Sequence, residues 1–214
     1  MNLDLLQYGA PWRGAQSAHV DAGLPTGFSE LDALLPDGGW TQGALTELLV
    51  PHEGIGALQL LLPALARLSQ QKRWIAWVAP PYVPYPPALA AAGVDLSRLL
   101  LVHPRAGGDG LHAIEQSLRS GTCGAVLAWP MAVDGPALRR LQTAAAEGNS
   151  WGILFRPEQF AEQPSPATLR LRIARRENAI EVSLLKRRGG WAAGPVTLSM
   201  DRLLEPHTAQ HRIS

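Results

Sequence analysis

Short apolar runs alternate with segments of helical periodicity over the first three quarters of the chain. The runs lack polar alternation, which is typical of strands covered on both faces of a sheet. They are Ala44–Val50, Trp74–Ala79, Leu99–His103, Ala125–Trp129 and Trp151–Phe155. The helical segments between them are Leu58–Leu68, Pro87–Ala92, Leu111–Leu118 and Pro136–Ala146. This alternation predicts βαβ crossovers, and so an α/β fold with a mainly parallel sheet flanked by helices.

After Pro157, apolar side chains occupy every second position of two segments. These are Leu169, Leu171 and Ile173, then Ile180, Val182 and Leu184. A period of two predicts an antiparallel hairpin with one buried and one polar face, and a turn near Glu177 and Asn178. Together with the preceding strands, this C-terminal antiparallel hairpin makes one mixed sheet.

The sequence divides into a domain over residues 28–200, an arm over 1–27 rich in glycine and proline, and a polar tail over 201–214. At the start of the domain, Phe28, Leu31 and Leu35 have helical spacing, and we expect Ser29 to cap that helix. A leucine stripe predicts that the segment Leu58–Leu68 packs into the core, with a kink at Pro63.

The segment after the first strand has the layout of a phosphate-binding loop without its charges. Such loops need glycines facing the phosphates, a lysine for the β- and γ-phosphates, and a Ser or Thr for Mg²⁺. In the matching window the lysine position holds Gly56 and the hydroxyl position holds Ala57, while Glu53 adds negative charge. We interpret the window as a vestigial loop that binds no cofactor; its members are Val50, Pro51, Gly54, Gly56 and Ala57. An ordinary turn that never bound phosphate is the alternative.

Carboxylates are missing where a nucleotide hydrolase would hold them. One apolar run ends in Trp129 instead of aspartate, and Ala79-Pro80-Pro81 follows another. Without an acid to orient water or a metal, the sequence predicts a pseudo-ATPase and no enzyme activity. A divergent ATPase that recruits Lys72 is the enzymatic alternative.

The remaining candidates for chemistry are isolated residues. His52, His103 and His112 lack the spacing of a zinc site, so we predict no metal site. Cys123, the single cysteine, is expected to be a buried small apolar residue instead of a reactive thiol.

Basic residues gather in the predicted hairpin, where the period of two places Arg170 and Arg172 on one face. We predict that they contact DNA or a partner protein; the alternative is a solvated outer face. The full set is Arg170, Arg172, Arg175, Arg176, Lys186, Arg187 and Arg188. Trp191 beside them would add a surface for base stacking.

Composition narrows the class of protein. Hydrophobic residues make up 46% of the 214 residues and charged residues 17%, as in folded chains. The net charge of +1 gives no strong basic field, so nucleic-acid binding would need a local patch. No apolar run reaches the ~20 residues of a membrane helix, and the amino terminus lacks the pattern of a secretory signal. We therefore expect a soluble, cytoplasmic protein with no membrane contact.

The order of these pieces resembles the RecA ATPase core, in which a Thr-Gly-x-x-x-Leu-Asp helix, a Gly-Gly turn and a Glu-bearing strand precede the phosphate loop. The corresponding residues are Thr26, Gly27, Leu31, Asp32, Gly38, Gly39 and Glu47. More narrowly, "ELLVPHEGIGALQLLLP" and "GVDLSRLLLVHP" look like the ImuA family of RecA-like proteins, and like its relative, the cell-division inhibitor SulA. The similarity covers roughly residues 20–200.

The ImuA resemblance implies a non-catalytic accessory protein of SOS-induced, error-prone translesion DNA synthesis. Its implied partners are an ImuB-type inactive Y-family polymerase homologue and an error-prone replicative-type polymerase, and contact with RecA and DNA is left open. The SulA resemblance implies instead a cell-division inhibitor that caps the tubulin-like protein FtsZ. Length favours the translesion interpretation, because SulA-type chains are generally shorter and lack so full a carboxy-terminal hairpin and tail.

Overall fold

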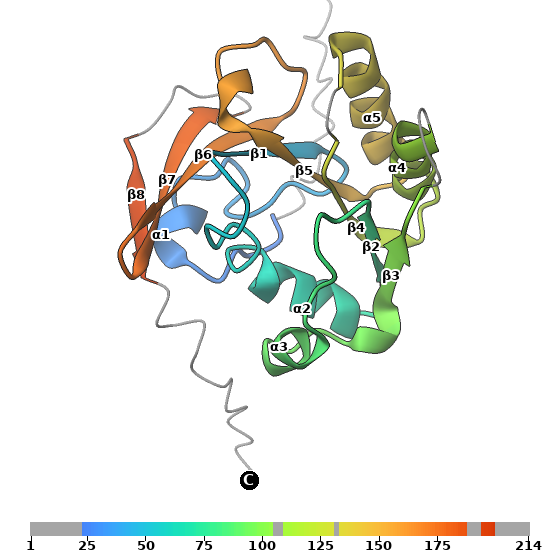
Figure 1. Ribbon diagram of the computed structural model, residues 1–214, viewed down its shortest axis with the longest axis horizontal. Helices are drawn as coiled ribbons and strands as arrows, with labels where there is room; N and C mark the ends of the chain where they lie inside the picture. The colour runs from blue at the N-terminus through green and yellow to red at the C-terminus, as the bar shows by residue number, and fades with distance from the viewer. Residues whose placement is uncertain (1–22, 105–108, 131–132, 188–193, 200–214) are drawn as a thin grey trace, which may run out of the picture.

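An eight-stranded mixed sheet forms the centre of the computed structural model, which describes residues 23–104, 109–130, 133–187 and 194–199 (Figure 1). Its order is β3-β2-β4-β5-β1-β6-β7-β8. Every pair from β3 across to β6 is parallel, and the pairs β6–β7 and β7–β8 are antiparallel. The strands are β1 (Leu45–Val50), β2 (Trp74–Val78), β3 (Leu99–Val102), β4 (Cys123–Ala128), β5 (Trp151–Pro157), β6 (Leu169–Arg176), β7 (Ala179–Lys186) and β8 (Val196–Ser199).

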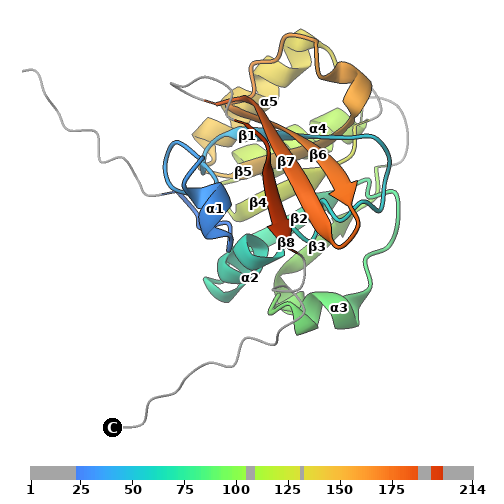
Figure 2. The ribbon, with the colours of Figure 1, turned by 90° about the vertical axis from the view of Figure 1, so that its left-hand side faces the viewer.

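Helices cover both faces of this sheet (Figure 1; Figure 2). One face packs against α1 (Ser29–Asp32), α2 (Leu62–Gln70) and α3 (Pro86–Ala91), and the other against α4 (Asp109–Arg119) and α5 (Gly135–Glu147). Two short 3-10 helices, η1 (Leu96–Arg98) and η2 (Glu158–Phe160), precede β3 and follow β5. Because strand side chains alternate in direction, neighbouring residues such as Ala76 and Trp77 enter different cores.

The predicted α/β architecture is confirmed. All five apolar runs are strands whose ends lie within two residues of the predicted bounds. The antiparallel hairpin is also confirmed, with Leu171 and Val182 buried on its inner face and the turn at Glu177 and Asn178. Glu177 adopts a φ of 44°, in the left-handed region that a tight turn requires.

The helix after β1 differs from its prediction. It begins at Leu62 instead of Leu58, and Pro63 lies in its first turn. Proline is favoured there because its missing N–H has no intrahelical acceptor at that position, so the expected kink does not form. Leu60 and Leu61 are nevertheless buried, because the turns before the helix pack into the same core.

The start of the domain differs from its prediction in one detail. Phe28, not Ser29, is the N-cap of α1, and no side chain caps the helix; the Thr26 hydroxyl instead accepts a hydrogen bond from the Phe28 N–H at 3.0 Å. Of the predicted arm only residues 23–27 are described, and Leu24 in it is buried and bridged to Trp40. The predicted tail, 201–214, lies outside the described residues.

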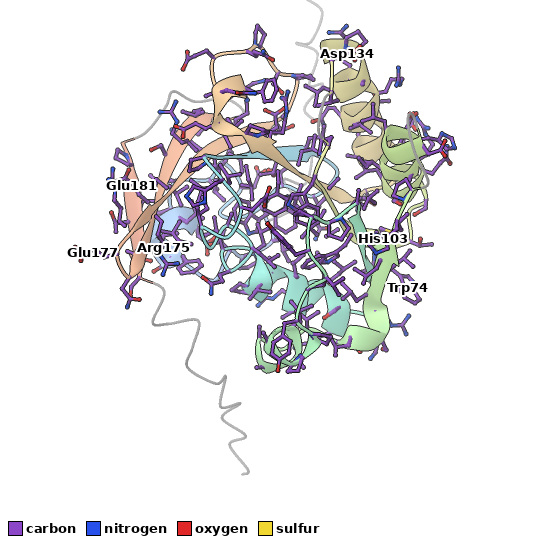
Figure 3. The ribbon with its side chains drawn as sticks, viewed as in Figure 1. Trp74, His103, Asp134, Arg175, Glu177 and Glu181 are labelled. Carbon is purple, nitrogen blue, oxygen red and sulfur yellow. The ribbon has the colours of Figure 1, made fainter. Side chains whose placement is uncertain are left out.

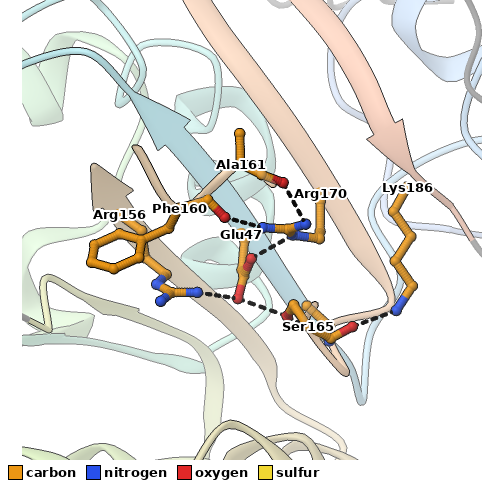
Figure 4. Close-up of polar contacts among 8 residues, drawn as sticks. Glu47, Arg156, Phe160, Ala161, Ser165, Arg170 and Lys186 are labelled. Atoms are coloured by element: carbon orange, nitrogen blue, oxygen red, sulfur yellow. Dashed lines mark hydrogen bonds and ion pairs between the residues drawn. The ribbon is translucent and has the colours of Figure 1, made fainter. Parts of the chain in front are cut away.

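A buried carboxylate joins the strands at the centre of the sheet (Figure 4). Glu47, on β1, is fully buried, and its Oε1 accepts a hydrogen bond from Arg156 Nη1 on β5 at 3.0 Å. Its Oε2 accepts one from Arg170 Nε on β6 at 2.7 Å. The Ser165 hydroxyl also donates to Oε1, at 2.8 Å. One side chain therefore connects three adjacent strands.

Backbone carbonyls complete the coordination of this cluster. The terminal nitrogens of Arg170 donate to the carbonyl oxygens of Phe160 and Ala161 at 2.8 and 3.0 Å. The guanidinium carbon of Arg156 lies 4.6 Å from the centroid of the Phe160 ring. Both buried cations are thus held by a shared acid and by the segment that follows β5.

Replacing Glu47 by Gln preserves the shape of the side chain and removes its charge, which leaves Arg156 and Arg170 buried without a carboxylate. We expect the free energy of unfolding to fall by about 3–5 kcal/mol, as found when one partner of a buried ion pair is removed. Urea unfolding followed by tryptophan fluorescence measures it.

Glu181→Gln is the matched control, because its ion pair with Arg176 is solvent-exposed and surface pairs contribute little. If the Glu47 variant were as stable as this control, the cluster would not hold the sheet together.

Candidate functional site

The segment between β1 and α2 lies at the carboxyl edge of the parallel strands, where α/β proteins commonly bind ligands. It consists of turns from Pro51 to Leu61, with Gly54 and Gly56 at φ values of 80° and 95°. Side chains rarely adopt these values, so the glycines permit the turns. A Cβ atom on Gly56 would approach Cδ1 of Ile180, on the hairpin, to 3.0 Å, so the loop packs closely there.

A cavity of about 340 Å³ opens beside this loop. Four members of the vestigial set line it, namely Val50, Gly54, Gly56 and Ala57. Its inner wall is aromatic: the ring of Trp129 stacks on Phe155 at 4.5 Å with an interplanar angle of 2°, and Trp77 lies 5.8 Å from Trp129. Trp129 therefore fills the position at the end of β4 where a nucleotide hydrolase would hold an acid. The absence of ATP binding at this loop stays a prediction.

Acidic side chains pair with several arginines of the expected basic patch. Arg170 is only 6% exposed and is bound to Glu47, so it must be removed from the predicted binding surface. Arg172 lies 3.0 Å from Glu158, and Arg176 forms two hydrogen bonds with Glu181. The hydrogen bonds that Arg176 donates to Glu181 raise the pKa of Arg176. Alternation along the strand could not show that β1, η2 and β7 supply the acids that pair with these arginines.

The other members of the basic set point to different places. Lys186 Nζ donates to the carbonyl of Ser165 at 2.7 Å, and Arg187 Nη1 donates to the carbonyl of Leu34 at 2.7 Å. Arg175 lines the cavity, since it follows the inward-facing positions of β6. Arg188 and Trp191 lie outside the described residues.

An exposed apolar surface lies at the other edge of the sheet, and the sequence did not reveal it. We call it the β3 surface; its members are Trp74, Leu96, Leu100 and Leu101, which are 37%, 40%, 44% and 37% exposed. The Arg98 guanidinium lies 5.4 Å from the Trp74 ring centroid. Among the described strands β3 pairs with β2 alone, so its outer backbone edge is open. Figure 3 shows Trp74 and His103 on this side, and Arg175, Glu177 and Glu181 on the opposite side.

The loop between β2 and α3 extends this apolar exposure. Tyr82, Val83 and Tyr85 are 73%, 74% and 70% exposed. Within the described residues, all the large hydrophobic side chains that are this exposed therefore lie between Trp74 and Leu101. Exposed large apolar side chains of this kind are typical of interaction surfaces.

A capped turn holds the β3 surface in place. Asp95 Oδ1 accepts hydrogen bonds from the Ser97 hydroxyl and backbone N–H at 2.6 and 3.0 Å, at the start of η1. The Asp95 backbone N–H donates to the Ser69 hydroxyl of α2, and Lys72 lies 3.5 Å from Oδ2. The bonds from Ser97, assisted by Lys72, lower the pKa of Asp95. Leu96 and Arg98 are positioned by this turn.

In the described part of the chain, the histidines and the single cysteine do not form a metal site. No group of three potential metal ligands gathers there. Cys123 is buried, as predicted, and its lack of reactivity stays a prediction. Its carbonyl accepts hydrogen bonds from Arg73 and Ser150. None of the helices in the described ranges is long and apolar enough to cross a membrane.

Comparison with known proteins connects this architecture to a family. Residues 43–152 match the family model "Cell division inhibitor SulA". The chain is 36% identical over 115 residues to cell division inhibitor SulA of Edwardsiella piscicida, covering 51% of this chain and 68% of the relative. It is 30% identical over 112 residues to SulA of Photorhabdus laumondii subsp. laumondii, covering 52% and 63%, and 31% identical over 123 residues to SulA of Pectobacterium atrosepticum, covering 57% and 73%.

The matched segment contains some of the surfaces above and excludes others. It spans β1 to the beginning of β5, so the loop between β1 and α2 and the whole β3 surface lie inside it. The arginine-bearing hairpin begins at Leu169, beyond its end.

The lowered pKa of Asp95 predicts a pH-dependent contribution to stability. Its charged form is favoured in the folded state, so this contribution is complete above the unfolded value of about 3.9 and is lost as the pH falls through the lower folded pKa. We expect Asp95→Asn to reduce the melting temperature by a constant amount between pH 7 and 5, and the gap to close below about pH 4. A gap that widened on acidification would contradict this role.

Proposed function

The chain belongs to the family of the cell division inhibitor SulA, and we propose that it inhibits cell division by binding the tubulin-like division protein FtsZ. The family match covers residues 43–152, and the Edwardsiella relative is matched over two thirds of its length. A protein that inhibits its partner by binding needs a surface with affinity for that partner and needs no catalytic group.

The translesion interpretation is corrected by these comparisons. The family model and the relatives described above carry the name of a cell division inhibitor, so the preference drawn from chain length is wrong. Length misled because the hairpin and tail lie outside the matched segment and do not bear on it. FtsZ therefore replaces the ImuB-type protein, the polymerase, RecA and DNA as the proposed partner.

The β3 surface is the observation that carries this proposal. It gathers exposed apolar side chains with a Trp–Arg pair, and tryptophan and arginine are the residue types that dominate binding energy at protein interfaces. It lies beside a strand edge that is unpaired among the described strands, where another chain can add backbone hydrogen bonds. It also lies within the segment shared with the family.

We further propose that the domain is a RecA-like scaffold that has no ATPase activity. Support comes from the β–loop–helix arrangement at residues 45–70 and from a loop that carries Glu53 and no lysine. On this proposal FtsZ is blocked stoichiometrically, because each bound molecule occupies a surface needed for the next FtsZ subunit.

Leu100→Asp places a charge on the most exposed member of the β3 surface, at 44%, so the fold should tolerate it. We expect the concentration needed to halve the sedimentation of FtsZ polymers to rise at least about ten-fold, equivalent to about 1.4 kcal/mol of binding free energy. Circular dichroism verifies folding.

Thr197→Asp is the matched control, because it adds the same charge at an exposed position of β8, at the opposite edge of the sheet. Equal inhibition by folded Leu100→Asp and wild type would exclude this surface. No inhibition of FtsZ by wild type would exclude the proposed function itself.

Arg98→Ala tests whether the cation on Trp74 contributes to binding. We expect a loss of affinity for FtsZ of about three- to ten-fold, because the guanidinium both shields the ring and offers a charge to the partner. Arg172→Ala, outside the family segment and paired with Glu158, should change the affinity less than two-fold, or about 0.4 kcal/mol. Surface plasmon resonance on immobilised FtsZ measures both; the reverse order would assign binding to the hairpin.

A further inference from the structure

The cavity beside the vestigial loop has the form of a small-molecule site. Its volume of about 340 Å³ is at the lower end of the range typical of such sites. It lies at the carboxyl edge of the parallel strands, with Trp77, Trp129 and Phe155 in its wall. The rings of Trp129 and Phe155 are nearly parallel, and Trp129 is half-buried and lines the cavity, so part of its ring can contact a ligand there.

A buried donor without an acceptor gives the cavity a chemical preference. Trp77 is 3% exposed, and its Nε1 has no hydrogen-bond partner among the described residues. Burying an indole N–H without an acceptor is unfavourable, and most buried tryptophans find one. The Nε1 atom has almost no accessible surface in this structure, so a ligand that brings an acceptor to this wall satisfies the donor once the Trp77 ring turns toward the cavity.

The charges around the cavity oppose a phosphate chain. Of the residues that line it, Arg175 is the one arginine or lysine, and Glu53 stands on the same loop. Arg175 Nε already donates to the carbonyl of Glu177 at 2.9 Å, which leaves its terminal nitrogens to reach over the loop. Its Nη1 would lie 3.4 Å from a Cβ atom on Gly56. One cation beside an acid suits a polar, uncharged group better than a triphosphate.

We propose that this cavity binds an uncharged, planar heteroaromatic ligand of purine size, which stacks on Trp129 and, after a turn of the Trp77 ring, accepts a hydrogen bond from Trp77 Nε1. Arg175 supplies a second donor at the mouth. The site is separate from the β3 surface, so it stands or falls independently of the interaction with FtsZ.

Titration of the full chain with adenosine tests the site by ¹H–¹⁵N NMR of the indole N–H groups. Trp77→Phe identifies the Trp77 signal, because it deletes that N–H and keeps an aromatic ring. We expect this signal to shift downfield and to saturate with adenosine. Indole, a planar ring of similar size without a ring acceptor, should bind at least about five-fold more weakly, and ATP should bind no more tightly than adenosine.

Variants separate stacking from non-specific association. Trp129→Ala should weaken adenosine binding at least about ten-fold, and Trp129→Phe should restore it to within about three-fold of wild type, because a ring again faces the ligand. Trp74→Ala, on the β3 surface, is the tryptophan control and should leave binding unchanged. The proposal is overturned by the absence of a saturable Trp77 shift at millimolar adenosine, by tighter binding of ATP or indole, or by equal binding in Trp129→Ala.

Discussion

The ion pairs of Glu47 are the contact on which the arrangement of the sheet depends. A lone buried carboxylate would be strongly unfavourable, but here it is paired with Arg156 and Arg170 and accepts a third hydrogen bond from Ser165. These partners come from β5, from β6 and from the segment between them, so the parallel part of the sheet is attached to the hairpin through one side chain. The inner apolar faces alone would permit other registers of β6; the Glu47–Arg170 pair favours the observed one.

The same cluster separates the features that the sequence predicts from those that it does not. The strands and most helices follow from hydrophobic periodicity, because a continuous apolar run needs cover on both faces. The burial of Arg170 does not follow from periodicity. Alternation places Arg170 on the polar face without showing that η2 and the next loop cover that face. Glu47 stood out in the sequence as part of a RecA-like pattern, whereas in the structure its partners are arginines distant in the chain.

The β3 surface was missed for a related reason. A leucine run predicts a strand, but the same run fits a central strand or an edge, and only the order of strands distinguishes the two. At the edge, Leu100 and Leu101 are left partly exposed although they look like core residues. The carboxyl edge shows the opposite case: the absence of lysine and acid was visible in the sequence, but the aromatic cavity arises from three strands and could not be seen there.

We propose that this member of the SulA family acts by presenting the β3 surface to FtsZ, while the charged side chains of the hairpin stabilise the fold. Hydrogen–deuterium exchange of the full chain, with and without FtsZ, tests it most directly because every segment is observed at once. The account predicts slower exchange on binding within residues 74–101 and no change within 169–187. Protection confined to the hairpin, with residues 74–101 unaffected, would contradict it.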